Sequence, residues 1–422
     1  MLQVSFLREE KERVLEGLKK RNFKQLELVD EAIQLDDERK KTQQELDSQL
    51  AEINKISKEI GILMKEGKKE EAEAAKSKTA QYKESSKELT TKLSEIETSL
   101  LNILYQIPNI PYHLVKPGVS ADDNEIVYQS HEVHGLGEGA IPHWELAKKY
   151  NLIDFELGVK ITGAGFPVYK GQGARIQRAM IQFFLDKAVE AGYMEVQPPI
   201  LINAESGFGT GQLPDKEGQM YHATADDLYL IPTAEVPITN LYRDVIVAES
   251  ELPIKNVGYT PCFRREAGSY GAHVRGLNRV HQFDKVEIVR VEHPDNSYKA
   301  LQGMVRHVEK LMNKLELPYR ILLLCGGDMG FASAKTYDFE VWSAAQKRWL
   351  EVSSVSCFET FQSNRMKLRF RDENGKIELA HTLNGSALAL ARIVAAILEN
   401  NQTPEGIRIP KALHRYAGFK MI

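Results

Sequence analysis

Residues 260–276 read TPCFRREAGSYGAHVRG, and this stretch decides how the globular part of the chain is interpreted. An apolar lead-in over residues 257–263 is typical of a β-strand. Three charged residues, Arg264, Arg265 and Glu266, follow it directly. A sheet core does not accept consecutive unpaired charges, and a surface loop does not need an apolar lead-in. The pattern therefore predicts a strand that ends at a site for a charged ligand.

The residues that follow predict a hairpin. Arg275 and Arg279 come after a glycine-bearing loop, and VHQFDKVEIVRV (280–291) is typical of a returning strand. In an extended chain Arg264 and Glu266 face the same way, so one interpretation is an internal ion pair. The alternative is a clamp in which the arginines bind a polyphosphate by bidentate contacts. Glu266 would then accept a hydrogen bond from an exocyclic amine such as that of adenine.

Composition and charge limit the class of protein. The 422 residues are enough for two or three domains, and 42% are hydrophobic and 27% charged. A net charge of -4 gives no general basic field, so any nucleic-acid contact must be local. The first residues lack a signal peptide's apolar core, and no run approaches the ~18 apolar residues of a membrane span. Cys262, Cys325 and Cys357 form no CxxC motif; they indicate free thiols in the cytoplasm, with zinc ligation as the weaker alternative.

Residues from about 25 to 105 predict a long helical arm, because they lack proline and carry apolar residues at heptad spacing. Gly61 and Gly67 lie between two such stretches, which predicts an antiparallel hairpin on the order of 50 Å long. Its first helix should end near Lys65 and its second before Pro108. The arm could serve dimerisation or spacing, or it could reach a long partner. The seam positions are Ile53, Ile56, Ile60, Leu63, Tyr82, Leu89, Leu93, Ile96, Leu100 and Ile103.

After Pro108 the composition changes to that of a globular domain. Residues 106 to about 135 are interpreted as a linker, and helices are expected at roughly 172–191, 296–315 and 386–399. Short turns separate the strands, which favours an α+β fold with an antiparallel sheet. No GxxxxGK[ST] motif is present, and GLGEGA and KGQGAR are interpreted as turns. We therefore expect two domains, 1–105 and 106–422.

The apolar stretch HTLNGSALALARIVAAILEN (381–400) contains one arginine, Arg392, inside its expected helix. A buried arginine needs a partner, which is either a carboxylate of the protein or an anionic ligand. Asn384 or Ser386 is expected to cap the helix, so that its positive end faces the same region.

Two further segments carry oxygen ligands in apolar surroundings. Glu351, Ser353 and Ser354 in WLEVSSVSCFE suit a hard cation such as Mg²⁺ beside phosphates. Thr233 and Glu235 in LIPTAEVPITN place a hydroxyl near a carboxylate, which suits an ammonium group. Glu287 lies between Val286 and Ile288 and requires a buried donor.

Together these segments resemble the class II aminoacyl-tRNA synthetases. AGYMEVQPPIL resembles motif 1, FRRE motif 2 and NGSALALAR motif 3, in that order along the chain. GTGQLP, PTAEVPITN, TPCFRREAGSYG, HQFDKVE, GDMGFASAKTYDFEVW and HTLNGS narrow the resemblance to the seryl-tRNA synthetases of the bacterial type. The likeness covers nearly the whole chain, including the arm, which in that family contacts the long variable arm of its tRNA.

The resemblance implies a role for each matching residue. Arg264 and Arg392 would be the catalytic arginines, on the α- and γ-phosphates of ATP, and Arg275 would lie near the distal phosphates. Glu266 and Val280 would lie beside the adenine. The ATP-binding set implied by the family is Arg264, Arg265, Glu266, Arg275, Val280, Glu351, Val352, Ser353, Ser354 and Arg392. The serine-binding set is Thr233, Ala234, Glu235, Arg264, Glu287, Asn384 and Ser386, and the magnesium ligands are Glu351 and Ser354.

The family also implies substrates and partners. These are ATP with Mg²⁺, L-serine, tRNA(Ser) and, where it is present, tRNA(Sec), in a cytoplasmic homodimer without membrane contact. A ligase that charges a carrier protein and a non-catalytic coiled-coil protein are the rival functions. Asn364 and Gly165 depart from the family, which commonly has arginine there, and this places peripheral contacts in doubt.

Overall fold

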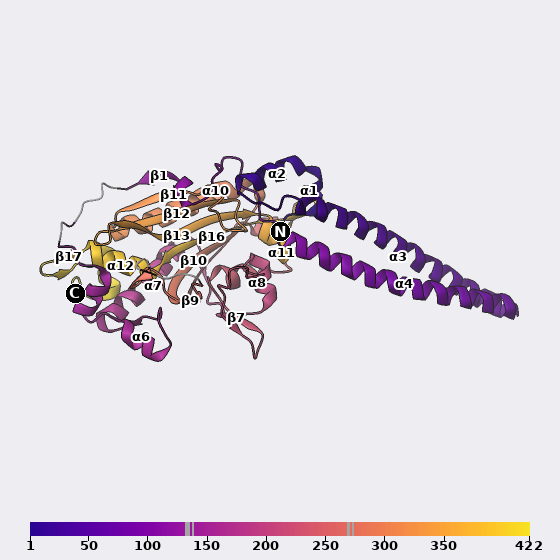
Figure 1. Ribbon diagram of the computed structural model, residues 1–422, viewed down its shortest axis with the longest axis horizontal. Coiled ribbons are helices and arrows are strands. Elements are labelled where there is room, and N and C mark those ends of the chain that lie inside the picture. Colours follow the sequence, from indigo (N-terminus) through magenta and orange to yellow (C-terminus); the bar gives the residue numbers. More distant parts are fainter. Residues whose placement is uncertain (131–135, 137–138, 268–270, 272–273) are drawn as a thin grey trace. The chain divides into compact units, whose positions relative to one another are not determined.

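The computed structural model describes residues 1–130, 136, 139–267, 271 and 274–422. The chain divides into two compact units (Figure 1). Unit 1 comprises Met1–Lys19 and Phe23–Pro108, and unit 2 comprises Lys20–Asn22 and Asn109–Ile422. No helix in the described ranges is both long and apolar enough to cross a membrane.

Unit 1 is helical and contains the antiparallel pair that the heptad pattern predicts. Its helices are α1 (Val4–Glu9), α2 (Lys11–Lys20), α3 (Leu28–Lys65) and α4 (Lys69–Leu104). Figure 1 shows α3 and α4 running side by side in opposite directions. Gly67 has φ +76° in the connecting turn, a conformation that favours glycine, whereas Gly61 lies inside α3. The expected ends of both helices are confirmed.

The seam between α3 and α4 is less apolar than expected. Buried residues of α4 recur at every seventh position, and two of them, Thr79 and Ser86, are polar. The Gln49 side chain of α3 donates to Ser85 Oγ at 3.0 Å and accepts from Ser86 Oγ at 3.2 Å. Buried polar pairs of this kind fix the register of a coiled coil at some cost in stability.

Unit 2 is built on an eight-stranded sheet with the order β1-β11-β12-β13-β16-β10-β9-β4. Every neighbouring pair is antiparallel except β4 and β9. This confirms the α+β class and the antiparallel sheet. The strands are β1 (Glu125–Gln129), β4 (Met194–Glu195), β9 (Ile254–Phe263), β10 (Gln282–Glu292), β11 (Tyr319–Leu323), β12 (Lys335–Ser343), β13 (Arg348–Glu359) and β16 (His381–Ala389).

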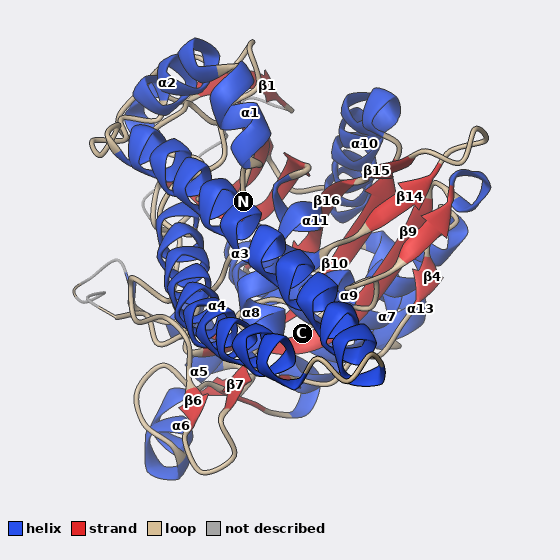
Figure 2. Cartoon of the chain, turned by 90° about the vertical axis from the view of Figure 1, so that its right-hand side faces the viewer, coloured by secondary structure: helices blue, strands red, loops and turns tan. Residues whose placement is uncertain are grey.

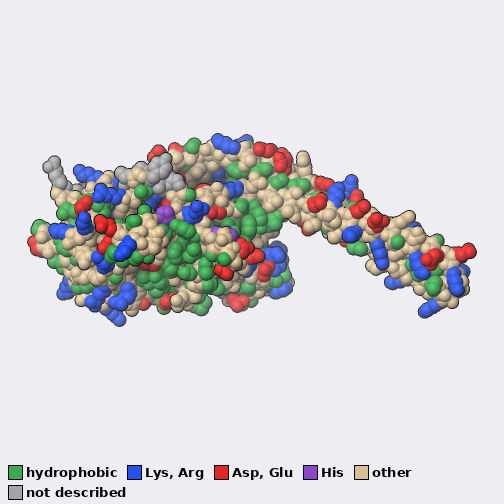
Figure 3. Space-filling view, turned by 60° about the horizontal axis from the view of Figure 1, so that its bottom comes forward, with side chains coloured by type: hydrophobic (Ala, Val, Ile, Leu, Met, Phe, Trp, Pro, Cys, Tyr) green, Lys and Arg blue, Asp and Glu red, His purple; other side chains and the backbone are tan. Residues whose placement is uncertain are grey.

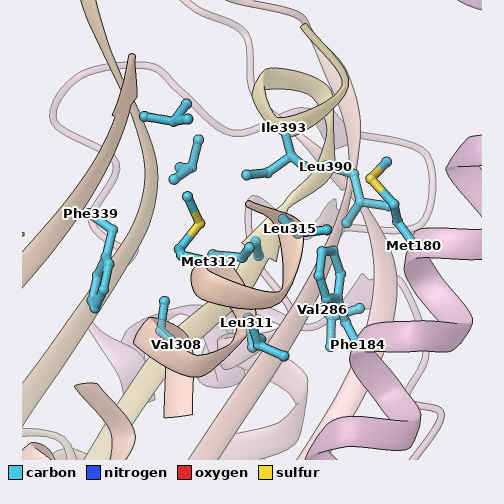
Figure 4. Close-up of a cluster of buried hydrophobic side chains, with 14 of the residues drawn as sticks. Met180, Phe184, Val286, Val308, Leu311, Met312, Leu315, Phe339, Leu390 and Ile393 are labelled. Carbon is cyan, nitrogen blue, oxygen red and sulfur yellow. The ribbon is translucent and has the colours of Figure 1, made fainter. Parts of the chain in front are cut away.

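Three helices cover one face of this sheet: α7 (Gly171–Glu190), α10 (Ser297–Leu315) and α12 (Leu390–Asn400). Their apolar side chains and those of the sheet form one buried cluster (Figure 4). Val286 and Ile288 of β10 belong to this cluster. Because successive strand residues alternate between faces, Lys285 and Glu287 point to the opposite face of the sheet. In Figure 2, β9, β10 and β4 lie beside α7.

Smaller elements surround the sheet. The helices are α5 (His143–Lys149), α6 (Phe155–Ile161), α8 (Ala204–Thr210), α9 (Glu235–Asn240), α11 (Phe361–Met366) and α13 (His414–Ala417). The short strands are β2 (Ile153–Asp154), β3 (Val168–Tyr169), β5 (Leu201–Ile202), β6 (His222–Ala223), β7 (Leu228–Leu230), β8 (Ile246–Ala248), β14 (Arg369–Arg371), β15 (Ile377–Leu379), β17 (Gln402–Thr403) and β18 (Gly406–Ile407).

Three sequence-based assignments were wrong. The helix expected from Ser386 begins only at Leu390, because the preceding residues form β16 between β13 and β10. Asn384 and Ser386 are therefore strand residues and cap no helix. The expected linker contains β1, which pairs with β11. KGQGAR is not a turn, since α7 begins at Gly171; half of GLGEGA, residues 135, 137 and 138, lies outside the described residues.

Candidate functional site

Arg264 is the first residue after β9, and its backbone still pairs with the opposite side of the β9–β10 hairpin. Its N–H donates to the His281 carbonyl at 2.9 Å. The guanidinium lies 5.3 Å from the centre of the Phe283 ring, and its Nε donates to the Pro232 carbonyl at 3.3 Å. The side chain is thus held over an aromatic face at the edge of the sheet, with its terminal nitrogens available to an anion.

Glu266 is paired differently from the expectation. Its carboxylate accepts from Arg279 Nη1 at 2.8 Å, and no Arg264–Glu266 pair occurs among the described contacts. The strand has ended by this point, and Glu266 has φ +47°, so the two side chains do not alternate as strand neighbours. The exposed Arg265 is anchored through its N–H to the Gln219 carbonyl at 2.8 Å.

Arg392 extends from α12 toward the same region. Its Nε donates to the Asn278 carbonyl at 2.9 Å and its Nη1 to the Glu351 carbonyl at 2.7 Å. Burial lowers the pKa of Arg392; Glu351 raises it, and the charges of Arg264 and Arg279 lower it further. The Glu351 carboxylate is 3.9 Å from Nη1. Arg264 and Arg279 therefore lie close enough to Arg392 for their positive charges to repel it, an arrangement that an anion relieves.

Arg275 and Val280 lie on the returning side of the hairpin. The exposed Arg275 guanidinium is 4.8 Å from the centre of the Trp144 ring, and its Nη2 is 3.5 Å from Glu145 Oε1. Val280 is buried. Arg275 is thus supported by α5, which lies more than a hundred residues earlier in the chain.

A β-bulge brings Glu351 and Ser354 to the same face of β13. Glu340 pairs with Glu351, but Phe339 pairs with Ser353 and Asp338 with Ser354, so the bulged strand has one extra residue. In a regular strand, residues three apart face opposite sides. Val352 packs in the core, and Ser353 Oγ donates to the Ser386 carbonyl at 2.5 Å.

Asp338 adds a carboxylate that the sequence analysis did not select. Burial and the nearby charge of Glu351 raise its pKa well above the usual range, against a hydrogen bond from Ser354. Its Oδ1 has no hydrogen-bond partner among the described residues. Glu351, Ser354 and Asp338 thus form a group of oxygen ligands, the type that Mg²⁺ prefers.

Glu287 finds its buried donor in Lys285, two residues earlier on the same face of β10. Lys285 Nζ lies 2.5 Å from Glu287 Oε2 and also donates to Thr233 Oγ1 at 2.7 Å. Thr233 Oγ1 and Ser386 Oγ each lie 3.4 Å from the same carboxylate oxygen. Ser386 is directly opposite Glu287 in the β10–β16 register. All these contacts use Oε2, so Oε1 is the oxygen free to meet a ligand.

Glu235 is a second buried carboxylate, close enough to Glu287 to be affected by its charge. Burial and the charge of Glu287 raise its pKa to about 7, although hydrogen bonds from Gln362 and Asn384 and the charge of Lys285 lower it. Gln362 Nε2 donates to Glu235 Oε1 at 2.7 Å. Ala234, beside Glu235, is fully buried. The structure therefore brings the residues selected for an ammonium and a hydroxyl into one buried cluster.

Sequence analysis missed Lys285, Gln362, Asp338 and Phe283. Lys285 could have been found, because period-two alternation places it on the face of Glu287. Gln362 and Asp338 had no local signal, since they reach the site through the packing of α11 and the register of β12.

Gly165 is explained by its surroundings. It has φ +82°, and a Cβ there would lie 2.1 Å from the His281 ring. His281 in turn hydrogen-bonds through Nδ1 with the Arg264 carbonyl at 3.0 Å. An arginine does not fit at position 165 in this arrangement.

Comparisons with known proteins agree with this geometry. Residues 1–111 match the family model of the seryl-tRNA synthetase N-terminal domain, and residues 220–401 match that of the class II tRNA synthetase core domain (G, H, P, S and T). A serine–tRNA ligase of Salinibacter ruber is 51% identical over 424 residues, covering 100% of this chain and 99% of the relative. The chain belongs to the seryl-tRNA synthetase family.

Solved structures of this family have the same fold. The seryl-tRNA synthetase of Pyrococcus horikoshii, complexed with ATP, matches with a TM-score of 0.92 and 33% identity, covering 100% of this chain and 99% of that chain. The cytoplasmic serine–tRNA ligase of Naegleria fowleri, in complex with AMP, matches with a TM-score of 0.86 and 28% identity, covering 100% and 98%. The family resemblance drawn from the sequence motifs is thereby confirmed.

Proposed function

We propose that this chain is a serine–tRNA ligase. It activates L-serine with ATP and esterifies the 3′-terminal adenosine of tRNA(Ser), and of tRNA(Sec) where the cell contains it. One observation carries the proposal: Arg264 is hydrogen-bonded to the Pro232 carbonyl, which directly precedes Thr233. This contact joins the arginine cluster to the carboxylate pocket, so a phosphate and an amino acid can bind side by side.

On the nucleotide side, Arg264 contacts the α-phosphate, Arg392 the γ-phosphate and Arg275 the distal phosphates. Glu266 and Val280 lie at the adenine, and the Phe283 ring below Arg264 adds an apolar surface for the base. Arg265 and the β13 residues Val352 and Ser353 complete this side of the site. Support for the proposal comes from the repulsion of Arg392 by the charges of Arg264 and Arg279, which a polyphosphate offsets.

On the amino-acid side, the ammonium of serine binds at Thr233, Ala234 and Glu235. Its hydroxyl donates to Glu287 Oε1, with Ser386 and Asn384 beside it. Lys285 occupies Glu287 Oε2 and thereby holds the carboxylate in place. The serine carboxylate then points toward Arg264 and the α-phosphate.

Magnesium fits the oxygen ligands of β13. Glu351 and Ser354 would hold it, because the bulge places both on one face, and the unpartnered Asp338 Oδ1 is a further oxygen ligand beside them. Mg²⁺ typically takes one or two carboxylates and completes its shell with water and substrate phosphates. When bound, it would neutralise phosphate charge during the transfer.

The reaction proceeds in two steps. An oxygen of the serine carboxylate attacks the α-phosphorus, and the bond to the bridging oxygen breaks, releasing pyrophosphate. A ribose hydroxyl of the tRNA then attacks the carbonyl carbon of the adenylate, and AMP leaves. The first step brings an anion onto an anion, so Arg264 and Arg392 act by positioning and charge stabilisation; in the second step the ribose hydroxyl gives up its proton as AMP leaves, and no covalent enzyme intermediate is needed.

The remaining assignments follow from the same proposal. Residues 1–105 form the tRNA-binding domain with its α3–α4 arm, and residues 106–422 form the catalytic domain. The enzyme works in the cytoplasm, where the buried free thiols Cys262, Cys325 and Cys357 stay reduced.

We further propose a homodimer through motif 1. Met194 is 59% exposed and Leu201 41% exposed, although both are large and apolar. Figure 3 shows hydrophobic side chains gathered on one face of unit 2. Exposed apolar patches of this kind mark protein interfaces.

An ATP–pyrophosphate exchange assay with each proteinogenic amino acid tests the function. Exchange that depends on serine, followed by transfer to tRNA(Ser), is the expected result. Serine-dependent exchange without transfer to tRNA would favour a ligase that charges a carrier protein. Absence of exchange with every amino acid would refute the proposal and favour a non-catalytic role.

A further inference from the structure

His143 and Glu399 form a fully buried pair that the proposed reaction does not use. Both side chains have 0% exposure, and His143 Nδ1 lies 2.7 Å from Glu399 Oε1. His143 begins α5, and Glu399 lies in the last turn of α12. Burying an ionised carboxylate is costly unless hydrogen bonds compensate for the lost water.

Glu399 receives that compensation from several segments. Its Oε1 accepts from the His143 backbone N–H at 3.0 Å and from Gln346 Nε2 at 3.1 Å. Its Oε2 accepts from the Ser343 hydroxyl and from the Ala345 N–H. Burial alone would raise the pKa of Glu399, but the hydrogen bonds from His143 and Ser343 outweigh it and lower that pKa. The carboxylate is therefore ionised and joins α5, α12 and the β12–β13 connection.

The other nitrogen of His143 reaches the motif 2 hairpin. The backbone N–H of Leu277 donates to His143 Nε2 at 2.8 Å. Nε2 must therefore be the unprotonated nitrogen, and Nδ1–H donates to Glu399. Gly276 has φ +68°, and a Cβ on it would lie 2.3 Å from Nε2, so glycine is required for this close approach.

The same network extends to both ends of the phosphate site. Leu277 is two residues after Arg275, whose guanidinium also lies over Trp144, the neighbour of His143. Asn278 Nδ2 donates to Gln346 Oε1 at 2.8 Å, while the Asn278 carbonyl accepts from Arg392 Nε. Arg275 and Arg392 are thus both tied to segments that Glu399 and His143 hold.

We infer that His143, oriented by Glu399, is a positioning residue that fixes the segment 275–278 and thereby places Arg275 and Arg392 for the distal phosphates of the nucleotide. The inference rests on the proposed function. Arg264 lies outside the network and is held by Pro232 and Phe283, so the α-phosphate contact does not depend on His143.

Because His143 affects only the contacts to the distal phosphates, its loss should change the affinity for ATP more than the affinity for AMP. Loss of the His143–Leu277 bond should weaken ATP binding by about 10- to 100-fold, as expected for misplaced charged groups. AMP lacks the distal phosphates, and its affinity should stay within about 3-fold of the parent. A merely structural role of the buried pair would change both affinities together.

Two substitutions at one position separate the two bonds of the imidazole. His143→Asn keeps a donor near Nδ1 for Glu399 but loses the acceptor for Leu277. His143→Gln places its amide nearer the Nε2 position and can keep that acceptor. Calorimetric titration of each variant with ATP and with AMP, both with Mg²⁺, should show the larger loss of ATP affinity in His143→Asn.

His307→Gln is the matched control, because His307 is another buried histidine of unit 2, on α10 and remote from this network. It should lower the melting temperature without changing the ATP-to-AMP affinity ratio. A double variant, His143→Asn with Arg275→Ala, should lose less ATP affinity than the sum of the two single losses, because part of the His143 effect acts through Arg275 and only the part that acts through Arg392 remains.

Equal loss of ATP and AMP affinity, or equal losses in His143→Asn and His143→Gln, would overturn the inference. Additive losses in the double variant would do the same. If His143→Asn does not fold, the ATP-to-AMP ratio of His143→Gln decides: parent-like values for both nucleotides support the inference, and a shared loss refutes it. The parent protein's serine-dependent exchange is measured separately, so failure of the proposed function is recognised independently.

Discussion

Substituting Glu287 by alanine should lower serine activation far more than it lowers the residual activation of alanine. Glu287 is 1% exposed, and its Oε2 is occupied by Lys285, Thr233 and Ser386. A hydroxyl that donates to the remaining oxygen makes a hydrogen bond to a charged group, with a net stabilisation of about 1.5–3 kcal/mol. That range corresponds to a serine-to-alanine ratio about 10- to 150-fold lower in the variant.

The change also leaves the Lys285 ammonium buried without its carboxylate. Removing one partner of a buried ion pair costs about 3–5 kcal/mol of folding stability. Serine and alanine both bind beside the same unpaired lysine, so this stability cost cancels in the ratio of serine to alanine activation. The double variant Lys285→Met/Glu287→Ala should recover much of the stability, measured by urea unfolding, while the ratio stays low.

Pyrophosphate exchange with serine and with alanine, on parent and both variants, measures the ratio of kcat/KM values. The parent should reject alanine by roughly 10⁴ or more, because alanine leaves the carboxylate unpaired. Threonine should be rejected mainly by crowding of its methyl group, by roughly 10–200-fold. An unchanged serine-to-alanine ratio in the Glu287→Ala variant would show that Glu287 does not recognise the hydroxyl.

Four other outcomes are expected. Arg264→Ala should keep the fold, checked by circular dichroism, and lose about 3–4 kcal/mol of transition-state stabilisation in exchange; activity within a few-fold of the parent would contradict its role. Because burial and Glu287 raise the pKa of Glu235 to about 7, KM for serine should rise as the pH falls through that value and the carboxylate is neutralised; Glu235→Gln should abolish the pH dependence. Replacing residues 28–103 by a short linker should spare serine activation and destroy tRNA charging; equal charging would make the arm merely structural. Analytical ultracentrifugation should show a dimer, and an active monomer at all concentrations would exclude one.

The sequence predicted the fold where the pattern was long and regular. The heptad spacing gave both ends of the α3–α4 pair, and the helices α7 and α10 begin within a residue or so of their expected starts. The prediction of a helix from Ser386 in NGSALA was wrong, because small residues before an apolar run are compatible with either a helix start or a central strand. Pairing of β16 with β10 and β13 on both sides decided for the strand.

The candidate site was predictable as a set of residues but not as a set of contacts. Glu351 and Ser354 share a face only because of the bulge in β13, which period-two alternation argues against. Glu266 pairs with Arg279 because the chain has left the strand before position 266. Long-range partners such as Gln362 reach the pocket from separate elements, and local pattern carries no information about them.

The charges of the site explain why these contacts are compatible with one stable fold. On the amino-acid side, burial and the charge of Glu287 raise the pKa of Glu235 to about 7, and the charge of Lys285 offsets them only in part. On the nucleotide side, the charges of Arg264 and Arg279 repel Arg392. Free serine is a zwitterion, so its ammonium compensates the first imbalance while its carboxylate and the ATP phosphates compensate the second. The serine ammonium therefore balances the carboxylates on the amino-acid side, and the phosphates and the serine carboxylate balance the arginines on the nucleotide side. The repulsion on both sides is offset only when both substrates are bound.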